Sequence, residues 1–279
     1  MIIITTAIEM TNYVNSALRN GVEVGLVPTM GALHQGHLSL IDRAKKENQL
    51  VVVSIFVNPV QFNRKEDLEK YPRTFELDKT LLEQASVDAL FYPSVNEIYP
   101  IDKKLVYDMD GLDASMEGPN RPGHFNGVIQ AVTRLLDIVQ PTRAYFGEKD
   151  FQQLAIIKHM TQKLGYNLEI IGCPTLREAD GLAMSSRNVL LRPDERKKAS
   201  VIFQVLSQLK KEAQTKSIMS LKEEAIDVLK KVKGSKLEYL ELVNPDTLEP
   251  VDDSIDGSVQ ACVAIWLGGV RLIDNMQVK

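Results

Sequence analysis

Hydrophobic and polar residues along the first part of the chain follow a pattern that predicts strands separated by helices. Apolar runs at residues 22–27 and 50–57 are separated by an amphipathic stretch at residues 38–48. The second run is nearly continuous and rich in β-branched side chains, which is typical of a strand covered on both faces of a parallel sheet. Strands that alternate with helices at this spacing predict a doubly wound α/β domain.

Further elements extend this pattern. Residues 58–73 and 93–126 are long polar or irregular connections, and connections of such length inside compact domains are usually functional or disordered. The length and polarity of residues 58–73 suggest a lid. The other expected elements are helices at 9–20, 74–85, 128–139 and 151–164 and strands at 87–92, 105–108, 143–146 and 168–173.

The pattern changes near residue 187. Two charged amphipathic helices are predicted at residues 195–214 and 220–233, and three strands follow at 237–243, 259–266 and 270–274. A helix pair followed by a meander of strands indicates a separate small α+β domain. We therefore expect a larger domain at residues 1–187 and a smaller C-terminal domain at residues 188–279.

The most informative stretch is PTMGALHQGH at residues 28–37, which connects the first predicted strand to a helix. A helix start presents unpaired backbone N–H groups and the positive end of a dipole, so it suits a phosphate. Gly31 and Gly36 permit a tight turn and close approach to a ligand. His34 and His37 can donate hydrogen bonds to phosphate oxygens during transfer. Two histidines in a turn are more often solvated surface side chains, so the rest of the sequence has to decide.

Polar turns follow several of the predicted strands. Besides residues 28–37, they are NPVQF at 58–62 and GEKD at 147–150. Ligands of open α/β sheets bind outside the carboxyl ends of the strands, where these turns are expected. Lys149 would lie at a helix start, an unfavourable place for a cation, and this favours a functional role. Asp150 has a simpler explanation as the N-cap of the following helix.

Composition excludes some classes of protein. The chain has 279 residues, 44% of them hydrophobic and 25% charged, as in an ordinary soluble protein of one large or two modest domains. Its net charge of −4 argues against nucleic-acid binding as the main function. No apolar run is long enough to span a bilayer, and the first residues lack the basic region of a signal peptide. Cys173 and Cys262 are expected to be buried small hydrophobes, which fits a reducing cytoplasm.

Several motifs together carry a resemblance to a known family. PTMGALHQGH resembles the HxGH signature of the nucleotidyltransferase superfamily that includes class I aminoacyl-tRNA synthetases, and MSSR at residues 184–187 resembles its second phosphate-binding motif, commonly KMSKS. HxGH alone is weak evidence. The ordered set FVNPVQF, YPRT, RPGHFNGV, FGEKDFQQL and LREADGLAMSSRN is specific, and over essentially the whole chain it resembles the pantothenate synthetase (pantoate–β-alanine ligase) family. The departure of these residues from KMSKS is one that this family shares.

The resemblance implies a Rossmann-like, doubly wound parallel sheet with a second, smaller α+β domain, and an ATP-dependent synthesis of an amide. Pantoate would attack the α-phosphorus of ATP to give pantoyl adenylate and pyrophosphate. The amine of β-alanine would then attack the adenylate, releasing pantothenate and AMP. No protein nucleophile is needed, which agrees with the absence of a convincing catalytic cysteine or serine triad in the sequence. The resemblance also implies Mg²⁺ and a homodimer.

The same resemblance implies roles for individual residues. His34, His37, Lys149, Ser185, Ser186 and Arg187 would be catalytic, with His37 as the family's proposed proton donor. Gln61 and Gln153 match the family's pantoate-binding glutamines, and Gln61 would also lie near β-alanine. Asp78 stands where relatives place a magnesium-associated carboxylate, and a solvated helix residue is the alternative. The residues expected to bind ATP are Met30, Gly31, Ala32, Leu33, His34, Gln35, Gly36, His37, Gly147, Glu148, Lys149, Asp150, Leu176, Met184, Ser185, Ser186 and Arg187.

Three other functions remain open at this point. Another HxGH nucleotidyltransferase would transfer AMP to a phosphate and would not need Gln61 and Gln153. An ATP-binding regulatory module without catalysis would bind ATP and release no pyrophosphate. A tRNA ligase is disfavoured, because neither an anticodon-binding domain nor a basic nucleic-acid surface is evident. His124 and Arg121 are expected either to line the pocket or to order a loop.

Overall fold

The computed structural model describes residues 1–99 and 106–279, and the chain forms two compact units. The first comprises Met1–Met109, Arg121–Glu148 and Ile156–Pro174, and the second comprises Asp110–Asn120, Lys149–Ala155 and Thr175–Lys279. The main segment of the second unit thus starts ahead of residue 188, and two earlier segments join it. The division into functional domains at residues 187 and 188 stays a prediction.

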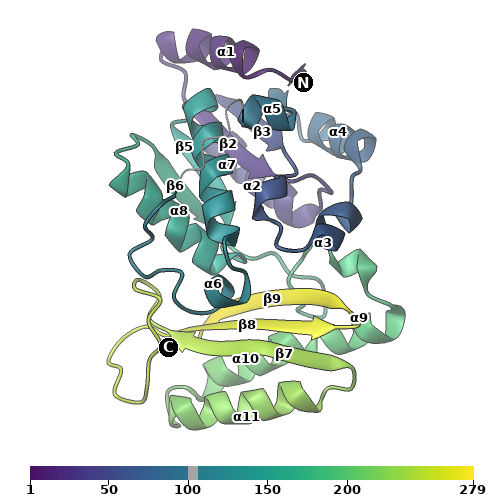
Figure 1. Ribbon diagram of the computed structural model, residues 1–279, viewed down its shortest axis with the longest axis vertical. Helices are drawn as coiled ribbons and strands as arrows, with labels where there is room; N and C mark the ends of the chain where they lie inside the picture. The colour runs from purple at the N-terminus through teal and green to yellow at the C-terminus, as the bar shows by residue number, and fades with distance from the viewer. Residues whose placement is uncertain (100–105) are drawn as a thin grey trace. The chain divides into compact units, whose positions relative to one another are not determined.

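The strands of the first unit form a six-stranded parallel sheet in the order β1-β4-β3-β2-β5-β6. Strands β2, β3, β5 and β6 of this sheet are labelled in Figure 1. From β2 the chain proceeds through β3 to β4 on one side, and from β5 to β6 on the other. The winding direction therefore reverses between β2 and β5, which confirms the doubly wound prediction and marks the place where such folds bind ligands. The strands are β1 (Ile2–Ile4), β2 (Val24–Thr29), β3 (Leu50–Ile55), β4 (Ala89–Phe91), β5 (Arg143–Gly147) and β6 (Glu169–Cys173).

Helices cover this sheet because its strands are apolar on both faces. Leu40, Ile41 and Ala44, spaced to share one side of a helix, pack with alternate residues of β3 such as Val51 and Val53. Side chains of a strand alternate between the two faces of a sheet, so the buried residue between Val51 and Val53 belongs to the opposite face. The longer helices that begin in the first unit or cross it are α1 (Ala7–Arg19), α2 (Gln35–Glu47), α4 (Phe75–Gln84), α7 (His124–Val139) and α8 (Phe151–Lys163).

The pairing of β2 with its two neighbours is unequal. It pairs with β3 along its whole length, but its register with β5 covers only Gly25 and Leu26. The carbonyl of Val24 accepts a hydrogen bond on the β5 side and that of Thr29 on the β3 side, so Pro28 faces the β5 side. Proline has no N–H and is rarely tolerated in a central strand. Pro28 is accommodated here because the ladder with β5 has already ended.

The second unit contains a three-stranded antiparallel sheet in the order β7-β8-β9, which confirms a smaller α+β part of the fold. One face of this sheet packs against α10 and α11, which lie side by side in Figure 1. Cys262 and Tyr239 belong to a second cluster with Met116 and Phe151. The elements of this unit are α6 (Glu117–Asn120), η2 (Asn188–Leu190), α9 (Pro193–Ala199), α10 (Val201–Glu212), α11 (Ile218–Lys231), β7 (Ser235–Val243), β8 (Gln260–Leu267) and β9 (Val270–Gln277).

Some local predictions were wrong. Strand β1 was not expected, and the helix predicted at 195–214 is two helices that meet at Ser200. The connection at 58–73 contains η1 (Pro59–Gln61) and α3 (Lys65–Lys70), and that at 93–126 contains α5 (Val95–Ile98) and α6. Of the strand predicted at 105–108, residues 106–108 form none, and residue 105 lies outside the described residues.

The predictions on cysteines and on membrane spans can be compared directly with the structure. Both Cys173 and Cys262 are buried, so the expectation of buried cysteines is confirmed, and burial raises the pKa of each thiol. Within residues 1–99 and 106–279, no helix combines the length and the apolar character needed to cross a membrane.

Candidate functional site

The two histidines of residues 28–37 cap α2 in the first unit. His34 is the N-cap residue, and its Nδ1 accepts a hydrogen bond from the Gly36 N–H at 3.1 Å. The Nδ1 of His37 accepts from the N–H of His34 at 3.3 Å, and the two ring centroids lie 4.1 Å apart. A neutral imidazole that accepts through Nδ1 carries its proton on Nε2. The cap therefore fixes the tautomer in which both rings have Nε2–H donors, beside the helix dipole that favours an anion.

The turn between β2 and α2 is held by Asp78 of α4. The N–H groups of Ala32 and Leu33 donate to its two carboxylate oxygens at 2.9 and 2.8 Å, and Thr74 Oγ1 donates at 3.2 Å. Asp78 is 1% exposed. Gly31 and Ala32 both have positive φ, and a Cβ on Gly31 would lie 3.0 Å from an Asp78 oxygen. The carboxylate thus stabilises an unusual backbone in the segment expected to bind ATP.

This geometry bears on the magnesium prediction. Magnesium usually binds one or two carboxylates together with substrate phosphates. Both oxygens of Asp78 already accept hydrogen bonds, and within the described residues no group of three or more His, Cys, Asp or Glu side chains could hold a metal ion. The observed contacts of Asp78 are those of a loop-holding residue, and its role as a magnesium ligand stays a prediction.

Gln61 lies beside the HxGH segment. Its Nε2 contacts the sulfur of Met30 at 3.1 Å, and its Oε1 accepts from Asn58 Nδ2 at 3.0 Å. Asn58 is 1% exposed; it also donates to the Gly127 carbonyl and accepts from the Tyr99 hydroxyl. Burial raises the pKa of Tyr99 to about 12, so this hydroxyl remains a donor at neutral pH. The structure thus brings together Met30 and Gln61, two of the predicted site residues.

His124 orders the same region. It is buried, and its Nδ1 lies 2.8 Å from the backbone oxygen of Gln61. Of the two expectations for His124, this contact matches loop ordering. The close approach of α7 to η1 at this point depends on Gly127, because a Cβ there would lie 2.8 Å from the backbone of Val60 and Gln61.

We expect Gly127→Ala to lower the free energy of unfolding by about 1–3 kcal/mol, because the added methyl group must push η1 away. Displacement of Gln61 should also raise the KM for pantoate, the substrate that the sequence resemblance predicts for this residue. Thermal unfolding and steady-state kinetics test both effects, with Gly257→Ala as the control, since a Cβ at Gly257 meets nothing within 4 Å. A pantoate KM equal to that of the unsubstituted chain would contradict the assignment of Gln61.

The GEKD segment follows β5, as predicted. Gly147 is the last residue of β5 and pairs with Cys173, whose carbonyl accepts from the Glu148 N–H at 2.8 Å. Lys149 and Asp150 belong to the second unit, in the segment Lys149–Ala155. There the carbonyl of Lys149 accepts a hydrogen bond from Asn275 at 2.9 Å. The backbone at Lys149 is therefore fixed by β9 of its own unit.

The loop at residues 175–188 is a braced hairpin in the second unit. Arg177 and Ala183 form an antiparallel bridge, and the Met184 N–H donates to the Leu176 carbonyl at 3.0 Å. Hence the main-chain carbonyl of Leu176, one of the residues expected to bind ATP, already has a partner. Ser185 Oγ accepts from the Arg187 N–H at 3.2 Å. The structure thus places Leu176 and the MSSR residues, Met184, Ser185, Ser186 and Arg187, on one hairpin.

Charged side chains hold the turn of this hairpin. Arg196 of α9 donates to both Glu178 and Asp180. The hydrogen bond from Arg196 holds the pKa of the Asp180 carboxyl below its usual value. At the tip, Gly181 has a φ of +89°, and a Cβ there would overlap the Phe203 ring, so this position requires glycine. The hairpin is therefore pre-organised by its own unit.

Gln153 is half-buried on α8 in the second unit, and its neighbour Gln152 is buried. Gln152 donates to the carbonyls of Leu112 and Ser115 and accepts from the Glu117 N–H, so it holds the segment Asp110–Asn120. Gln61 and Gln153 belong to different units.

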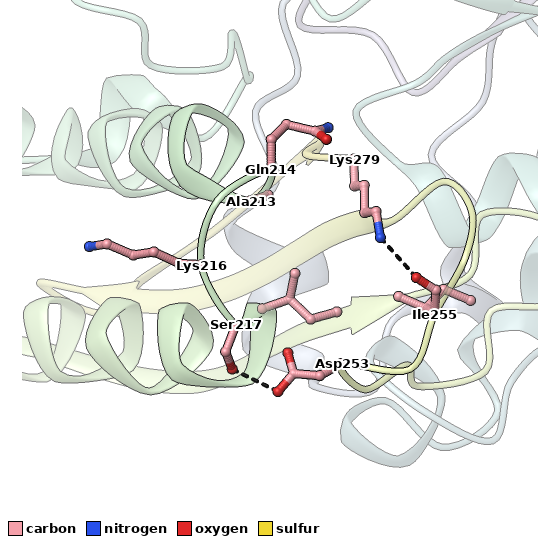
Figure 2. A pocket seen from close by; sticks show the side chains of 8 residues that line it. Ala213, Gln214, Lys216, Ser217, Asp253, Ile255 and Lys279 are labelled. Atoms are coloured by element: carbon pink, nitrogen blue, oxygen red, sulfur yellow. Dashed lines mark hydrogen bonds between the residues drawn. The ribbon is translucent and has the colours of Figure 1, made fainter.

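A hollow of about 390 Å³ lies elsewhere in the second unit, beside the start of α11 (Figure 2). Its polar groups are used locally: Asp253 accepts from Ser217 Oγ at 2.7 Å, and Lys279 donates to the Ile255 carbonyl at 2.8 Å. The hydrogen bond from Ser217 lowers the pKa of the Asp253 carboxyl. None of the predicted site residues lines this hollow, and its contacts are those of a helix cap.

Several residues with structural importance for the site were not found from the sequence. Asn58 and Asn275 position Gln61 and Lys149 respectively, and Tyr99 completes the bonds of Asn58. A signal existed for Asn58, because an amide directly after a buried strand lies at the edge where ligands bind. For Asn275 the sequence gives no comparable signal, because the carbonyl that it contacts lies 126 residues away along the chain.

Comparisons with known proteins agree on one family. The model of the pantoate-beta-alanine ligase family matches residues 2–277. Pantothenate synthetase from Caldicellulosiruptor saccharolyticus is 46% identical, with complete coverage of both chains. The enzyme of that name from Bacteroides fragilis is 50% identical over 93% of this chain and 92% of its own.

Solved structures give the same result. The crystal structure of pantothenate synthetase from Thermus thermophilus matches with a TM-score of 0.93 and 45% identity, covering 100% of this chain and 99% of the other. The pantoate-beta-alanine ligase from Francisella tularensis, solved in complex with beta-gamma ATP and beta-alanine, matches with a TM-score of 0.82 and 36% identity, over 99% and 97%. Sequence, fold and the HxGH segment at the carboxyl end of β2 therefore agree: the chain belongs to the pantoate–β-alanine ligase family.

Proposed function

We propose that this chain condenses pantoate with β-alanine in two steps driven by ATP. In the first step a carboxylate oxygen of pantoate attacks the α-phosphorus, and the bond to the β-phosphate breaks, releasing pyrophosphate. In the second step the amine of β-alanine attacks the carbonyl carbon of the adenylate. The amine loses a proton, AMP leaves and an amide remains. Family membership supports this choice over the other HxGH enzymes and over a non-catalytic module.

The observation that carries the proposal is the pair of imidazoles at the start of α2. Their Nδ1 atoms are occupied by backbone N–H groups, so the remaining ring donor of each is its Nε2–H. Donors fixed in place before reaction stabilise the charge that develops on a transferring phosphoryl group. We assign this role to His37 and His34, and the binding of ATP to residues 30–37 and to Gly147 and Glu148.

The second unit supplies further charge and hydroxyl donors. We propose that Lys149 and Arg187 interact with ATP phosphates, with Ser185 and Ser186 as additional donors. Asp150, Leu176 and Met184 are proposed to bind the nucleotide as well. Gln153 is proposed to bind pantoate, as is Gln61 of the first unit, which we also place near β-alanine, because an amide can both donate to a carboxylate and accept from a hydroxyl or amine.

Magnesium is proposed to accompany ATP. When bound, it supplies neutralisation of the phosphate charge. Asp78 is the residue proposed to approach the ion, although its present contacts are those of a loop-holding carboxylate. The proposal also includes a homodimer, a cytoplasmic location and the absence of nucleic-acid and membrane partners. Light scattering of the purified protein tests whether it is a homodimer.

The decisive experiment measures pyrophosphate release from ATP and pantoate, first without β-alanine and then with it. We expect a burst close to one equivalent of enzyme, followed by turnover to AMP and pantothenate when β-alanine is added. Replacement of pantoate by buffer is the control. If ATP binds but no pyrophosphate is released under either condition, catalysis is contradicted. If the rate of pyrophosphate release is the same with and without β-alanine, the second step is contradicted.

A further inference from the structure

A buried amide, that of Asn275 on β9, helps to hold the backbone at Lys149. Asn275 is 7% exposed, and its Nδ2 donates to the Lys149 carbonyl at 2.9 Å. Its Oδ1 accepts from Gln260 Nε2 at 2.7 Å. The bond from Gln260 fixes the orientation of the amide, so that the donor end meets Lys149. Asn275, Gln260 and Lys149 all belong to the second unit.

Asp274, the preceding residue, braces the other segment of this unit that is predicted to supply a cation, the hairpin that carries MSSR. Asp274 is 3% exposed, and Arg177 donates to its two oxygens at 2.6 and 3.0 Å. Arg177 also donates to the Gly181 carbonyl and lies 4.8 Å from the centre of the Phe203 ring. It forms the stem of the hairpin that carries MSSR, since it bridges Ala183. A charge-assisted, two-point bond of this kind sets both distance and angle.

Adjacent residues of a strand face opposite sides of a sheet, and β9 uses this alternation. Asp274 holds the hairpin stem, and Asn275 holds Lys149. The two residues are themselves linked, because Asp274 Oδ1 accepts from the Asn275 N–H at 2.8 Å and Arg177 donates to the Asn275 carbonyl at 3.3 Å. One dipeptide therefore sets the position of both segments within the unit.

We propose that Asn275 is a positioning residue for adenylate formation, acting through Lys149, with Asp274 as its brace. The inference rests on the proposed function, which assigns Lys149 to the phosphates of ATP. Loss of the bond to the Lys149 carbonyl lets the backbone at residue 149 move. A misplacement of about 1 Å can reduce a catalytic rate by about 10²-fold. Loss of one of several restraints is expected to give about a tenfold decrease in rate.

The test is a double-mutant cycle between Asn275→Asp and Lys149→Met, with pyrophosphate release from ATP and pantoate as the readout. Aspartate matches asparagine in shape but has an acceptor where the donor stood. We expect the kcat of Asn275→Asp to fall about tenfold in the unsubstituted chain and by less than about twofold in the Lys149→Met background. Equal losses in both backgrounds, or an unchanged kcat in a folded Asn275→Asp protein, would overturn the inference.

Two further variants keep the result interpretable. If Asn275→Asp fails to fold, Asn275→Ser replaces it in the same double-mutant cycle, because serine adds no charge and is too short to reach the Lys149 carbonyl. Gln277→Ala on the same strand is the matched control, because Gln277 is exposed and contacts Ser258 and Lys279 instead; its kcat should equal that of the unsubstituted chain. If Lys149→Met alone retains full pyrophosphate release, the proposed role of Lys149 fails. If Lys149→Met releases pyrophosphate more slowly, but Asn275→Asp lowers kcat by the same factor in both backgrounds, only the positioning role of Asn275 fails.

Discussion

Replacement of His37 by asparagine is expected to lower pyrophosphate release by about 10²–10³-fold, the loss typical of removing one donor to a developing charge. Asparagine can place its Oδ1 where His37 Nδ1 now accepts from the His34 N–H, so the cap of α2 is retained. It has no donor at the position of Nε2. The variant thus separates the chemical role of the ring from its structural role. Single-turnover pyrophosphate release measures the chemical role of the ring. ATP binding by calorimetry shows whether the start of α2 keeps its structure.

A set of companion variants strengthens this test. His37→Ala removes both the cap and the donor, and it should lose about 1 kcal/mol of stability in addition to activity. His37→Gln has an amide N–H near the Nε2 position and should recover part of the rate. His159→Ala is the matched control, because His159 contacts Tyr107 and is assigned no role in the site. Wild-type release by His37→Asn would remove His37 from the proposed chemistry.

Asp78→Asn is expected to have the second large effect. The amide would place a donor against the N–H of Ala32 or Leu33, leaving a buried bond unmade at a cost of about 2–3 kcal/mol. The turn that precedes the His34 cap would lose its brace. We therefore expect a higher KM for ATP and about a 10²-fold lower kcat/KM. Denaturant unfolding and kinetics with varied ATP measure these changes.

The same variant separates the two roles discussed for Asp78. If the carboxylate acts by holding the turn, the magnesium concentration that gives half-maximal rate should be unchanged in Asp78→Asn at saturating ATP. A shift of that midpoint to higher magnesium would instead support the predicted role as a metal ligand. Glu76→Gln, an exposed carboxylate on the same helix, controls for the general loss of negative charge.

The regular elements of the fold could be predicted because their apolar residues follow simple local patterns. The β3 run is almost continuously apolar, the apolar residues of α2 recur with the spacing of a helix, and both elements appear where expected. β1 was missed because it has only three residues, lies at the sheet edge and leaves Ile2 and Ile3 exposed, so no alternation marks it. The break at Ser200 was missed because the apolar spacing continues across it.

The residues that position the site were harder to predict because their partners are distant in sequence. Asn275 contacts a carbonyl 126 residues away, and Asp78 contacts backbone 45 and 46 residues away. Such bonds depend on tertiary placement and leave no local pattern. The residue identities of the HxGH segment were accessible from motifs, whereas the cap formed by the two Nδ1 atoms required coordinates.

Pro28 has a consequence for anyone who redesigns this sheet. A valine at this position would be the usual choice for a central strand, because it restores a ladder donor and raises β-propensity. That donor would face β5, where the register now ends at Leu26. An optimised sequence could extend the β2–β5 ladder and draw together the two strand ends from which residues 30–37 and 147–150 emerge. In such a redesign, added stability would come at the cost of room for the nucleotide that we propose to bind at these strand ends.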